Sequence, residues 1–340
     1  MNIAVVFGGK STEYSISCMS ASFVLSNLLG HNVIKLGITR EGKWYKTDAD
    51  LAAVKSGAWS EMEENLPVSI NINGKCFDYG TESFLPDVIF PVLHGKNGED
   101  GTVQGLFELM GVPYVGSRVL GSALCMDKIA AKAVFAHGNI TQVPYVVIDV
   151  DDCLESALEK IDIFLQYPVF VKPANAGSSI GITKCISEDD VAAALTKAFA
   201  VDRRVLIEQG LENIKEVEVA LMGNDDVISS VTGMICPSNE FYDYNAKYID
   251  EASLLVIPSR IPQEKQIKAI AEKAYRLCDC KGLARVDFMI DSVGYIYLNE
   301  INTMPGFTPI SMFPKLFEVS GISTEALINN LLDLAIHYNT

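Results

Sequence analysis

The chain has 340 residues, of which 49% are hydrophobic and 21% charged, and this content is enough for a large core in two or three domains. Acidic residues outnumber basic ones by 43 to 27, and the net charge of −16 excludes a general nucleic-acid binder, which needs a basic face. The sequence contains no apolar run of about 18 residues, so no membrane span is predicted. No basic segment follows Met1, so no secretory signal is predicted. We therefore expect a cytoplasmic protein without a membrane partner.

The first part of the chain alternates predicted strands and helices. Its continuous apolar runs predict strands at residues 3–7, 33–38, 88–92 and 112–116. A helix-like stretch follows Gly8-Gly9 as far as about residue 29, and a second helix at 102–110 ends at Gly111. This alternation predicts a parallel sheet in an N-terminal domain that ends near residue 118.

The middle part of the chain predicts a compact block of antiparallel character. Its predicted helices lie at residues 126–137, closed by Gly138, and at 189–200. Its predicted strands lie at 169–173, 182–185 and 205–208. The strand at 169–173 contains Lys172 near its end and leads into a loop of small residues at 176–181.

The last part of the chain predicts a strand at 217–222, a polar loop at 236–250 and helices at 262–279 and from Thr324 onward. Between these helices, two strand-like runs at 283–290 and 295–302 flank a turn of four residues, Asp291-Ser292-Val293-Gly294. Such a pattern predicts a hairpin.

The predicted hairpin carries a candidate metal site. Side chains alternate along a strand, so Arg285 and Asp287 share one face, and Glu300 and Asn302 share another. If the residue numbers of two paired residues sum to an odd number, as a two- or four-residue loop gives, all four side chains point to the same face of the hairpin. Two acids and an amide supply the oxygen ligands that suit Mg²⁺, and the guanidinium suits an anion. The alternative for this segment is a charged, solvated sheet face.

The glycine turn after the first strand matches no complete nucleotide motif. Phe7-Gly8-Gly9-Lys10-Ser11 lacks the glycine of a Walker A loop, because Ala4 stands at that position, and G-x-G-x-x-G is also absent. Glu13 then begins a helix, either as a first-turn acid that favours the dipole or as an anion for a substrate ammonium. His94–Gly101, at the carboxyl end of a strand, predicts a functional loop.

Three other charged residues are candidates for phosphate or nucleotide contacts. The amides of the 176–181 loop can hold phosphate oxygens, with Lys172 adding a positive charge. Lys128 lies in the first turn of a helix, where a cation gains nothing from the dipole, so a ligand role is favoured. Glu208, at a strand end, could accept from an adenine amino group or hold a ribose hydroxyl.

Taken together, these segments resemble the D-alanine–D-alanine ligases of the ATP-grasp superfamily. The N-terminal motifs of the resemblance are Phe7-Gly8-Gly9-Lys10-Ser11-x-Glu13-x-x-Ile16-Ser17 and His94-Gly95-x-x-Gly98-Glu99-Asp100-Gly101-x-x-Gln104-Gly105. The later motifs are Met126-Asp127-Lys128, Lys172-Pro173, Gly177-Ser178-Ser179, Phe241-Tyr242-Asp243-Tyr244-x-Ala246-Lys247-Tyr248, Arg285-x-Asp287 and Asn299-Glu300-Ile301-Asn302-Thr303-x-Pro305-Gly306. These motifs follow one another in family order across nearly the whole chain, so the resemblance is specific.

The resemblance implies an α/β (α+β) three-domain ATP-grasp fold. Residues 1–118 would form an N-terminal parallel-sheet domain, 119–210 a central ATP-grasp subdomain, and 211–340 a C-terminal ATP-grasp and metal-binding domain. The nucleotide is expected between the central and C-terminal domains. The family is commonly dimeric, so a homodimer is expected.

The resemblance also implies an activity, namely ATP-dependent ligation of two D-alanine molecules through an acyl phosphate, for peptidoglycan precursor synthesis. The implied catalytic residues are Glu13, Ser178, Tyr248, Arg285 and Gly306. The implied ATP-binding residues are Lys128, Lys172, Ser179, Glu208, Glu216 and Lys247. Two Mg²⁺ ions, replaceable by Mn²⁺, are expected at Asp287, Glu300 and Asn302, and the 236–250 loop is expected to close as a lid.

The second substrate is the least determined part of the prediction. His94, Ser311 and Met312 are the implied substrate-binding residues, and an apolar Met312 facing the second substrate favours a methyl group over a hydroxyl. A hydrophobic pocket rejects an added hydroxyl only weakly, so a D-alanine–D-serine ligase remains an alternative. A nucleotide-binding regulator without turnover is a third hypothesis, and the filled catalytic positions argue against it.

Overall fold

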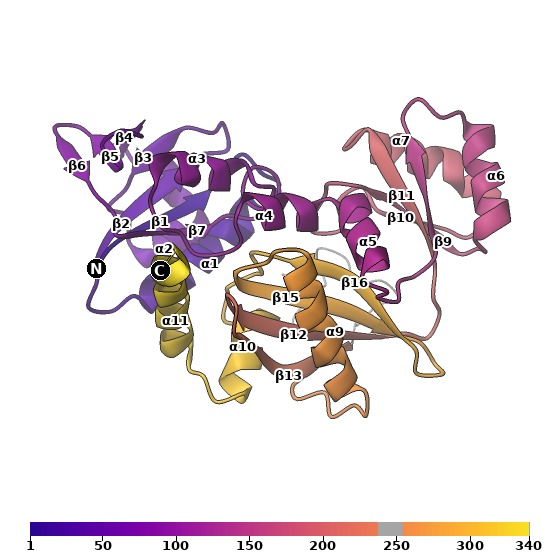
Figure 1. Ribbon diagram of the computed structural model, residues 1–340. Coiled ribbons are helices and arrows are strands. Elements are labelled where there is room, and N and C mark those ends of the chain that lie inside the picture. The colour runs from indigo at the N-terminus through magenta and orange to yellow at the C-terminus, as the bar shows by residue number, and fades with distance from the viewer. Residues whose placement is uncertain (237–253, 340) are drawn as a thin grey trace.

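The computed structural model describes residues 1–236 and 254–339, whose backbone forms three separate sheets (Figure 1). The N-terminal sheet is joined through a short helical connection to a central, smaller sheet, and the C-terminal sheet lies below both in this view. Within the described residues, no helix has the length and apolar character needed to cross a membrane.

The N-terminal sheet has the strand order β6-β5-β4-β3-β2-β1-β7. Its strands are β1 (Asn2–Gly8), β2 (Asn32–Ile38), β3 (Trp44–Lys46), β4 (Leu66–Asn71), β5 (Cys76–Tyr79), β6 (Glu82–Phe84) and β7 (Val88–Val92). Its helices are α1 (Tyr14–Ser26), α2 (Leu51–Ser56) and α3 (Thr102–Met110), and α4 (Val119–Met126) follows. The strand β1 pairs in parallel with β2 and β7, which confirms the predicted parallel sheet, and the remaining strands extend it antiparallel.

Helices cover both faces of β1, which explains why its sequence is a continuous apolar run rather than an alternating one. Val5 and Phe7 pack with α1 residues on one face, whereas Ala4 and Val6 pack with α3 residues on the other. The chain therefore leaves β1 and β7 on opposite sides of the sheet, and their carboxyl ends form a crevice where ligands bind in open α/β sheets.

The central sheet has the order β10-β9-β11-β8 and is antiparallel throughout, as predicted. Its strands are β8 (Tyr145–Asp149), β9 (Val169–Pro173), β10 (Thr183–Cys185) and β11 (Arg204–Gln209). The helices of this region are α5 (Lys128–His137), α6 (Leu154–Phe164) and α7 (Val191–Phe199). The side chain of Asp127 accepts from the amides of Ile129 and Ala130, and this cap fixes where α5 begins.

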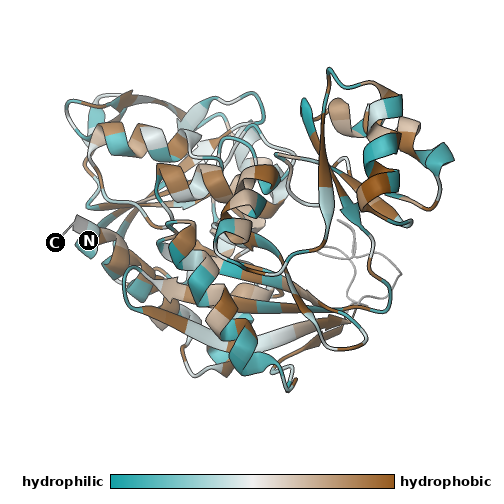
Figure 2. Cartoon of the chain, turned by 45° about the vertical axis from the view of Figure 1, so that its right-hand side comes forward, coloured by the Kyte–Doolittle hydropathy of each residue, from teal (hydrophilic) through white to brown (hydrophobic). Residues whose placement is uncertain are grey.

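The C-terminal sheet has the order β14-β13-β12-β15-β16. Its strands are β12 (Lys215–Gly223), β13 (Val227–Cys236), β14 (Leu254–Val256), β15 (Gly282–Ile290) and β16 (Ile296–Asn302). Its helices are α9 (Glu264–Leu277), α10 (Met312–Val319) and α11 (Thr324–Ile336). The buried residues of α9, Ile267, Ala271 and Ala274, recur once per helical turn, and Figure 2 shows hydrophobic and hydrophilic stretches alternating along the helices.

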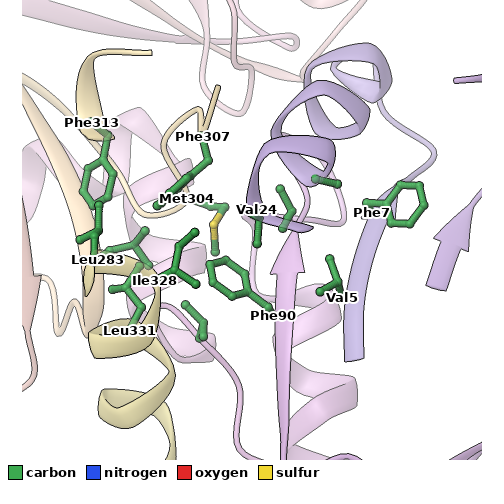
Figure 3. Packing of buried hydrophobic residues seen from close by; sticks show 14 of the residues in the cluster. Val5, Phe7, Val24, Phe90, Leu283, Met304, Phe307, Phe313, Ile328 and Leu331 are labelled. Atoms are coloured by element: carbon green, nitrogen blue, oxygen red, sulfur yellow. The ribbon is translucent and has the colours of Figure 1, made fainter. Parts of the chain in front are cut away.

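One hydrophobic core joins the two ends of the chain. Val5, Phe7 and Phe90 of the N-terminal sheet share a buried cluster with Phe307 and with Leu331 of α11 (Figure 3). Because this cluster connects the first and last sheets, the C-terminal helices hold the N-terminal unit against the C-terminal sheet. The division into domains at residues 118 and 210 remains our prediction.

Several elements differ from the predicted ones, and β8, β13, β14, α2, α4, α6 and α10 were not predicted at all. The strand predicted at 112–116 is only an isolated bridge between Ile89 and Tyr114, since the pairing does not continue on either side. The strands β3 to β6 were not predicted, because they are short and largely exposed on at least one face.

Candidate active site

The candidate metal residues lie on a hairpin that contains a β-bulge. Near its turn, Ile290 pairs with Ile296 and Phe288 pairs with Leu298, whereas beyond the bulge Asp287 pairs with Glu300 and Arg285 pairs with Asn302. The extra residue is Asn299, and it shifts the alternation of β16 by one position. All four predicted side chains therefore face the same side. The prediction was right about the shared face, but the bulge produces it rather than the length of the turn.

Asp287 accepts hydrogen bonds from two of the other predicted side chains. Arg285 donates from Nε and Nη2 to the two carboxylate oxygens of Asp287, both at 2.8 Å, and Asn302 donates to Oδ2 at 3.0 Å. The Arg285 Nε atom also lies 3.0 Å from Oε2 of Glu218, on the neighbouring strand β12. The guanidinium is thus fixed between two carboxylates and aimed into the site.

The donor set of this cluster fits a hard divalent cation. Asp287 and Glu300 face each other across the two strands, and Asn302 adds an amide. Lys128 Nζ lies 3.6 Å from Oε2 of Glu300, so a positive charge already neighbours one of the two acids. No group of three His, Cys, Asp or Glu side chains suited to a metal occurs in the described part of the chain. Two carboxylates with an amide oxygen therefore favour Mg²⁺ or Mn²⁺ over zinc.

A buried charge cluster lies beside the hairpin. Glu208 is 2% exposed and forms ion pairs with Lys132, at 2.6 Å, and with Lys172. Burial alone would raise the pKa of Glu208, but the two ammonium groups outweigh it and lower that pKa to about 2. Burial lowers the pKa of Lys132, whereas the charge of Glu208 outweighs burial at Lys172 and raises its pKa. Lys172 therefore stays charged and faces the cavity.

The small-residue loop and the first helix meet at one hydrogen bond. Ser178 Oγ donates to Glu13 Oε1, and this bond joins the central region to the N-terminal unit. A Cβ on Gly177 would lie 2.7 Å from Oε2 of Glu13, so the close approach requires glycine at this position. Lys128 Nζ donates to the carbonyl of Ala176 at 2.6 Å and supports the same loop.

His94 is buried between the first helix and the loop after β16. Its Nδ1 lies 3.0 Å from the carbonyl of Met304, and its Nε2 lies 3.2 Å from Ser20 Oγ. Ser20 Oγ also accepts from the amide of Phe307 at 3.1 Å. Burial lowers the pKa of His94 to about 4, so the ring is neutral at physiological pH. These bonds give His94 the geometry of a positioning residue for the loop that contains Gly306.

A single cavity of about 560 Å³ brings most of the predicted residues together. The predicted residues that line it are Glu13, His94, Lys128, Lys172, Ser178, Ser179, Glu208, Glu216, Arg285, Asp287, Glu300, Asn302 and Gly306. They come from all three sheets and from the first helix. Tyr248, Lys247 and nearly all of the predicted lid lie outside the described residues.

Ser311 and Met312 are not among the residues that line this cavity. Met312 is buried in the core with Phe313 and Leu316, and Ser311 bonds to Thr308 Oγ1 at 2.7 Å. The premise that Met312 faces a second substrate is therefore not met in this arrangement, because the side chain packs inward. The preference for a methyl group cannot be argued from Met312.

Lys132 and Glu218 were not predicted at the site, and Glu99 was predicted only as part of the functional loop at 94–101, without a role of its own. Lys132 follows Lys128 by one helical turn, and Glu218 follows Glu216 on the same strand face. In each case the spacing could have indicated that the second residue lies beside a predicted site residue. Glu99 accepts from the amides of Gly95, at 2.7 Å, and Met304, at 3.2 Å. Burial and then the charge of Glu13 raise the pKa of Glu99.

Comparisons with known proteins agree with this geometry. A family model described as "D-ala D-ala ligase N-terminus" matches residues 2–117, and one described as "D-ala D-ala ligase C-terminus" matches residues 134–333. The chain belongs to the D-Ala–D-Ala ligase family. Similar curated proteins are D-alanine–D-alanine ligases of Thermoanaerobacter sp. strain X514, 46% identical over 98% of this chain and 96% of the relative, and of Clostridium acetobutylicum, 42% identical over 99% and 98%.

Solved structures of the D-Ala–D-Ala ligase family share the fold. The VanG D-Ala:D-Ser ligase from Enterococcus faecalis is 39% identical with a TM-score of 0.90, covering 98% of this chain and 99% of that one. The D-alanine–D-alanine ligase from Coxiella burnetii is 31% identical with a TM-score of 0.89, covering 99% and 94%. The predicted ATP-grasp fold class is confirmed by these matches.

Proposed function

We propose that this member of the family joins two D-alanine molecules into D-alanyl-D-alanine, with conversion of ATP into ADP and phosphate. The observation that carries the proposal is the cavity in which Glu13 at the start of α1, Lys172 of the central sheet, and Arg285 and Glu300 of the C-terminal sheet converge. The sequence relatives named as D-alanine–D-alanine ligases support the same substrate. The dipeptide would serve peptidoglycan precursor synthesis.

In the first step, a carboxylate oxygen of one D-alanine attacks the γ-phosphorus of ATP, and ADP leaves. The ammonium group of this D-alanine would pair with Glu13, which Ser178 holds in place. Lys128, Lys172 and the 176–181 loop, including Ser179, would hold the phosphates, because two cations and backbone amides complement their charge. Glu208 and Glu216 line the same cavity and would contact the nucleoside, with Lys247 as a further candidate outside the described residues.

In the second step, the amine nitrogen of the second D-alanine, after losing a proton, attacks the acyl carbon, and phosphate leaves. Arg285 and the amide of Gly306 would stabilise the oxyanion that forms on the carbonyl oxygen. The fixed position of Arg285 between Asp287 and Glu218 supports this role, since a preorganised donor costs little to align. Tyr248 would contact Ser178, which bonds to Glu13. Ser311 would bind the carboxylate of the second D-alanine after a local rearrangement.

Asp287, Glu300 and Asn302 would hold two Mg²⁺ ions, with Mn²⁺ as a substitute. Bound there, the ions would offset the negative charge of the phosphates. The 236–250 loop would close over the site and exclude water. We also propose that the protein is cytoplasmic and forms a homodimer.

The D-serine-using alternative has one observation in its favour, which is the structural similarity to VanG D-Ala:D-Ser ligase. A direct assay separates the two reactions. The protein is incubated with ATP, Mg²⁺ and D-alanine, with or without D-serine, and ADP and dipeptides are quantified by mass spectrometry. We expect one ADP per D-alanyl-D-alanine formed from D-alanine alone. A dipeptide that forms only when D-serine is present would overturn the substrate assignment, and ADP without any dipeptide would overturn the ligase assignment.

A further inference from the structure

A second cavity, of about 300 Å³, lies at the carboxyl ends of β1, β2 and β7. Its lining begins with Gly8–Ser11 after β1, Ile38 at the end of β2 and Leu93–His94 after β7. The remaining walls come from the β2–β3 turn, from residues 96–98 and from the first turns of α3. It therefore occupies the crevice between β1 and β7, on the α3 side of the sheet, where the topology of open α/β sheets places ligands.

The walls of this second cavity are mostly apolar. Leu93, Val103 and Ile38 are nearly fully buried, and Leu106 of α3 and Trp44 are partly buried beside them. Small-molecule sites have volumes of roughly 300–1,000 Å³ and largely apolar walls, so the cavity meets the lower end of that range. Its size fits one apolar group of about two fused rings.

The charged side chains in the lining of the second cavity are both lysines, while Asp100, behind the lining, accepts from the amides of Asn97 and Thr102. The lining contains Lys10 and Lys96, both exposed at the opening, and no Asp or Glu side chain among the described residues. The neighbouring large cavity is lined by acids such as Glu13, Glu99 and Glu300. In a chain of net charge −16, two lysines without a neighbouring acid in the lining favour an anion.

The two cavities share a wall. His94 lines both of them, and the loops around the second cavity continue into the acids of the first. The Ser11 hydroxyl accepts from the amide of Glu13 at 3.1 Å, and the amide of Gly95 donates to Glu99 at 2.7 Å. A ligand that displaced either loop would move Glu13 or Glu99, so the two sites are expected to be coupled.

We propose that the second cavity binds a small amphipathic anion, with a bicyclic apolar group against Leu93, Val103 and Leu106 and an acidic group between Lys10 and Lys96. Its occupancy changes the affinity of the large cavity for its amino-acid substrate through His94 and the two loops. The binding part of this proposal is independent of the ligase activity, whereas the coupling part rests on the proposed function.

The test uses naphthalene-2-sulfonate as the anionic probe and 2-naphthalenemethanol as its uncharged analogue, titrated by calorimetry into the full chain saturated with ADP and Mg²⁺. We expect the sulfonate to bind at least tenfold more tightly than the alcohol. Sulfonate that binds the chain without ADP but not the saturated chain would lie in the large cavity and overturn the proposal, as would the absence of binding to both.

Two variants locate the probe. Leu106→Trp fills the cavity, and we expect it to weaken sulfonate binding at least tenfold, whereas Leu109→Trp on the exposed face of the same helix leaves binding unchanged. Lys10→Gln with Lys96→Gln is expected to weaken the sulfonate at least tenfold but not the alcohol, and Lys55→Gln with Lys75→Gln is the control of equal charge. Equal losses in variant and control would overturn the proposal, and the lysine pair decides it if Leu106→Trp fails to fold.

The coupling has its own measurement. In the ligase assay, we expect saturating sulfonate to change the KM for D-alanine at least threefold in the wild type and not in Leu106→Trp. A wild-type KM that stays constant while the calorimetric site is filled would overturn the coupling and leave the binding site standing. A protein that binds the sulfonate yet makes no dipeptide would contradict the proposed function instead.

Discussion

Asp287 and Glu300 face each other across β15 and β16 because the register of the hairpin shifts by one residue between them and the turn. Without the bulge at Asn299, the pairing of Ile290 with Ile296 would continue, and Glu300 would point to the opposite face, where Leu298 and Ile301 are buried. The bulge therefore creates the metal candidate from a sequence that would otherwise bury an acid.

Deleting Leu298 is expected to destabilise the fold by roughly 1–3 kcal/mol, because Asn299 would then take its buried position opposite Phe288. Deleting Asn299 removes only the extra residue and leaves Glu300 opposite Asp287, so this variant should keep its fold and ligation. Deleting Val293, which is 77% exposed in the turn of the same hairpin, is the matched control and should keep the register. Urea denaturation and the dipeptide assay measure both effects. Inactive protein after deletion of Asn299 would show that the bulge itself, and not only the face on which Glu300 lies, is needed for the site.

Glu300→Gln is expected to lower turnover by roughly 10²–10³-fold with little change in stability, because it removes one negative charge from the proposed cation ligands. Circular dichroism and phosphate release at several Mg²⁺ concentrations measure the two quantities. Glu325→Gln, at an exposed helix start, is the control. A Glu300→Gln enzyme with wild-type turnover and Mg²⁺ dependence would disprove the metal assignment.

The strands that carry the site could be predicted from the sequence, whereas the contacts between the side chains of the site could not. Periodicity found β1, β7, β15 and β16, because buried strands leave continuous apolar runs and the hairpin leaves a turn. It could not find the bulge at Asn299, which depends on how two strands pair rather than on either alone.

The partners of individual side chains were also beyond the sequence. Glu208 was interpreted as a nucleotide contact, which remains our proposal, but its ion pairs with Lys132 and Lys172 were not predicted. Met312 was expected at the cavity, but the start of α10 turns it into the core. Both outcomes depend on neighbours more than 30 residues away, which local patterns do not specify.

Lys132→Met is expected to cost roughly 1–3 kcal/mol of stability, because it leaves the buried Glu208 with a single ion pair. Lys160→Met is the control, since Lys160 pairs with Asp152 at a site where both side chains are about a third exposed, and such pairs contribute about 0–1 kcal/mol. Urea denaturation at pH 7 compares the two variants. A smaller loss in Lys132→Met than in Lys160→Met would contradict the charge cluster.

His94 makes stability depend on pH in a defined direction. Burial lowers its pKa from 6.5 to about 4, so the unfolded chain takes up this proton at a higher pH than the folded protein does. The stabilisation is complete above about pH 6.5 and is lost as the pH falls towards 4, by an amount on the order of 3 kcal/mol. We expect His94→Gln to flatten unfolding free energy over this window, and His137→Gln, at an exposed position, to leave it unchanged. Equal slopes in wild type and His94→Gln would refute the buried neutral ring.

The bond from Ser178 to Glu13 gives the final prediction. Ser178→Ala removes a donor to a charged acceptor, worth roughly 1.5–3 kcal/mol, so we expect the KM for the first D-alanine to rise about tenfold or more. The fold should remain intact, because Ser178 lies on a loop and its hydroxyl packs in no core cluster.

Ser15→Ala, on the exposed side of α1, is the matched control and should leave KM unchanged. Initial rates over a range of D-alanine concentrations, with ATP and Mg²⁺ saturating, give KM and kcat separately. If Glu13 positions the substrate ammonium, Ser178→Asn, which keeps a donor and tolerates the positive φ of 48° at this position, should restore part of the lost affinity. A loss confined to kcat, or no difference between the alanine and asparagine variants, would mean that the side chain acts elsewhere in the reaction than through Glu13.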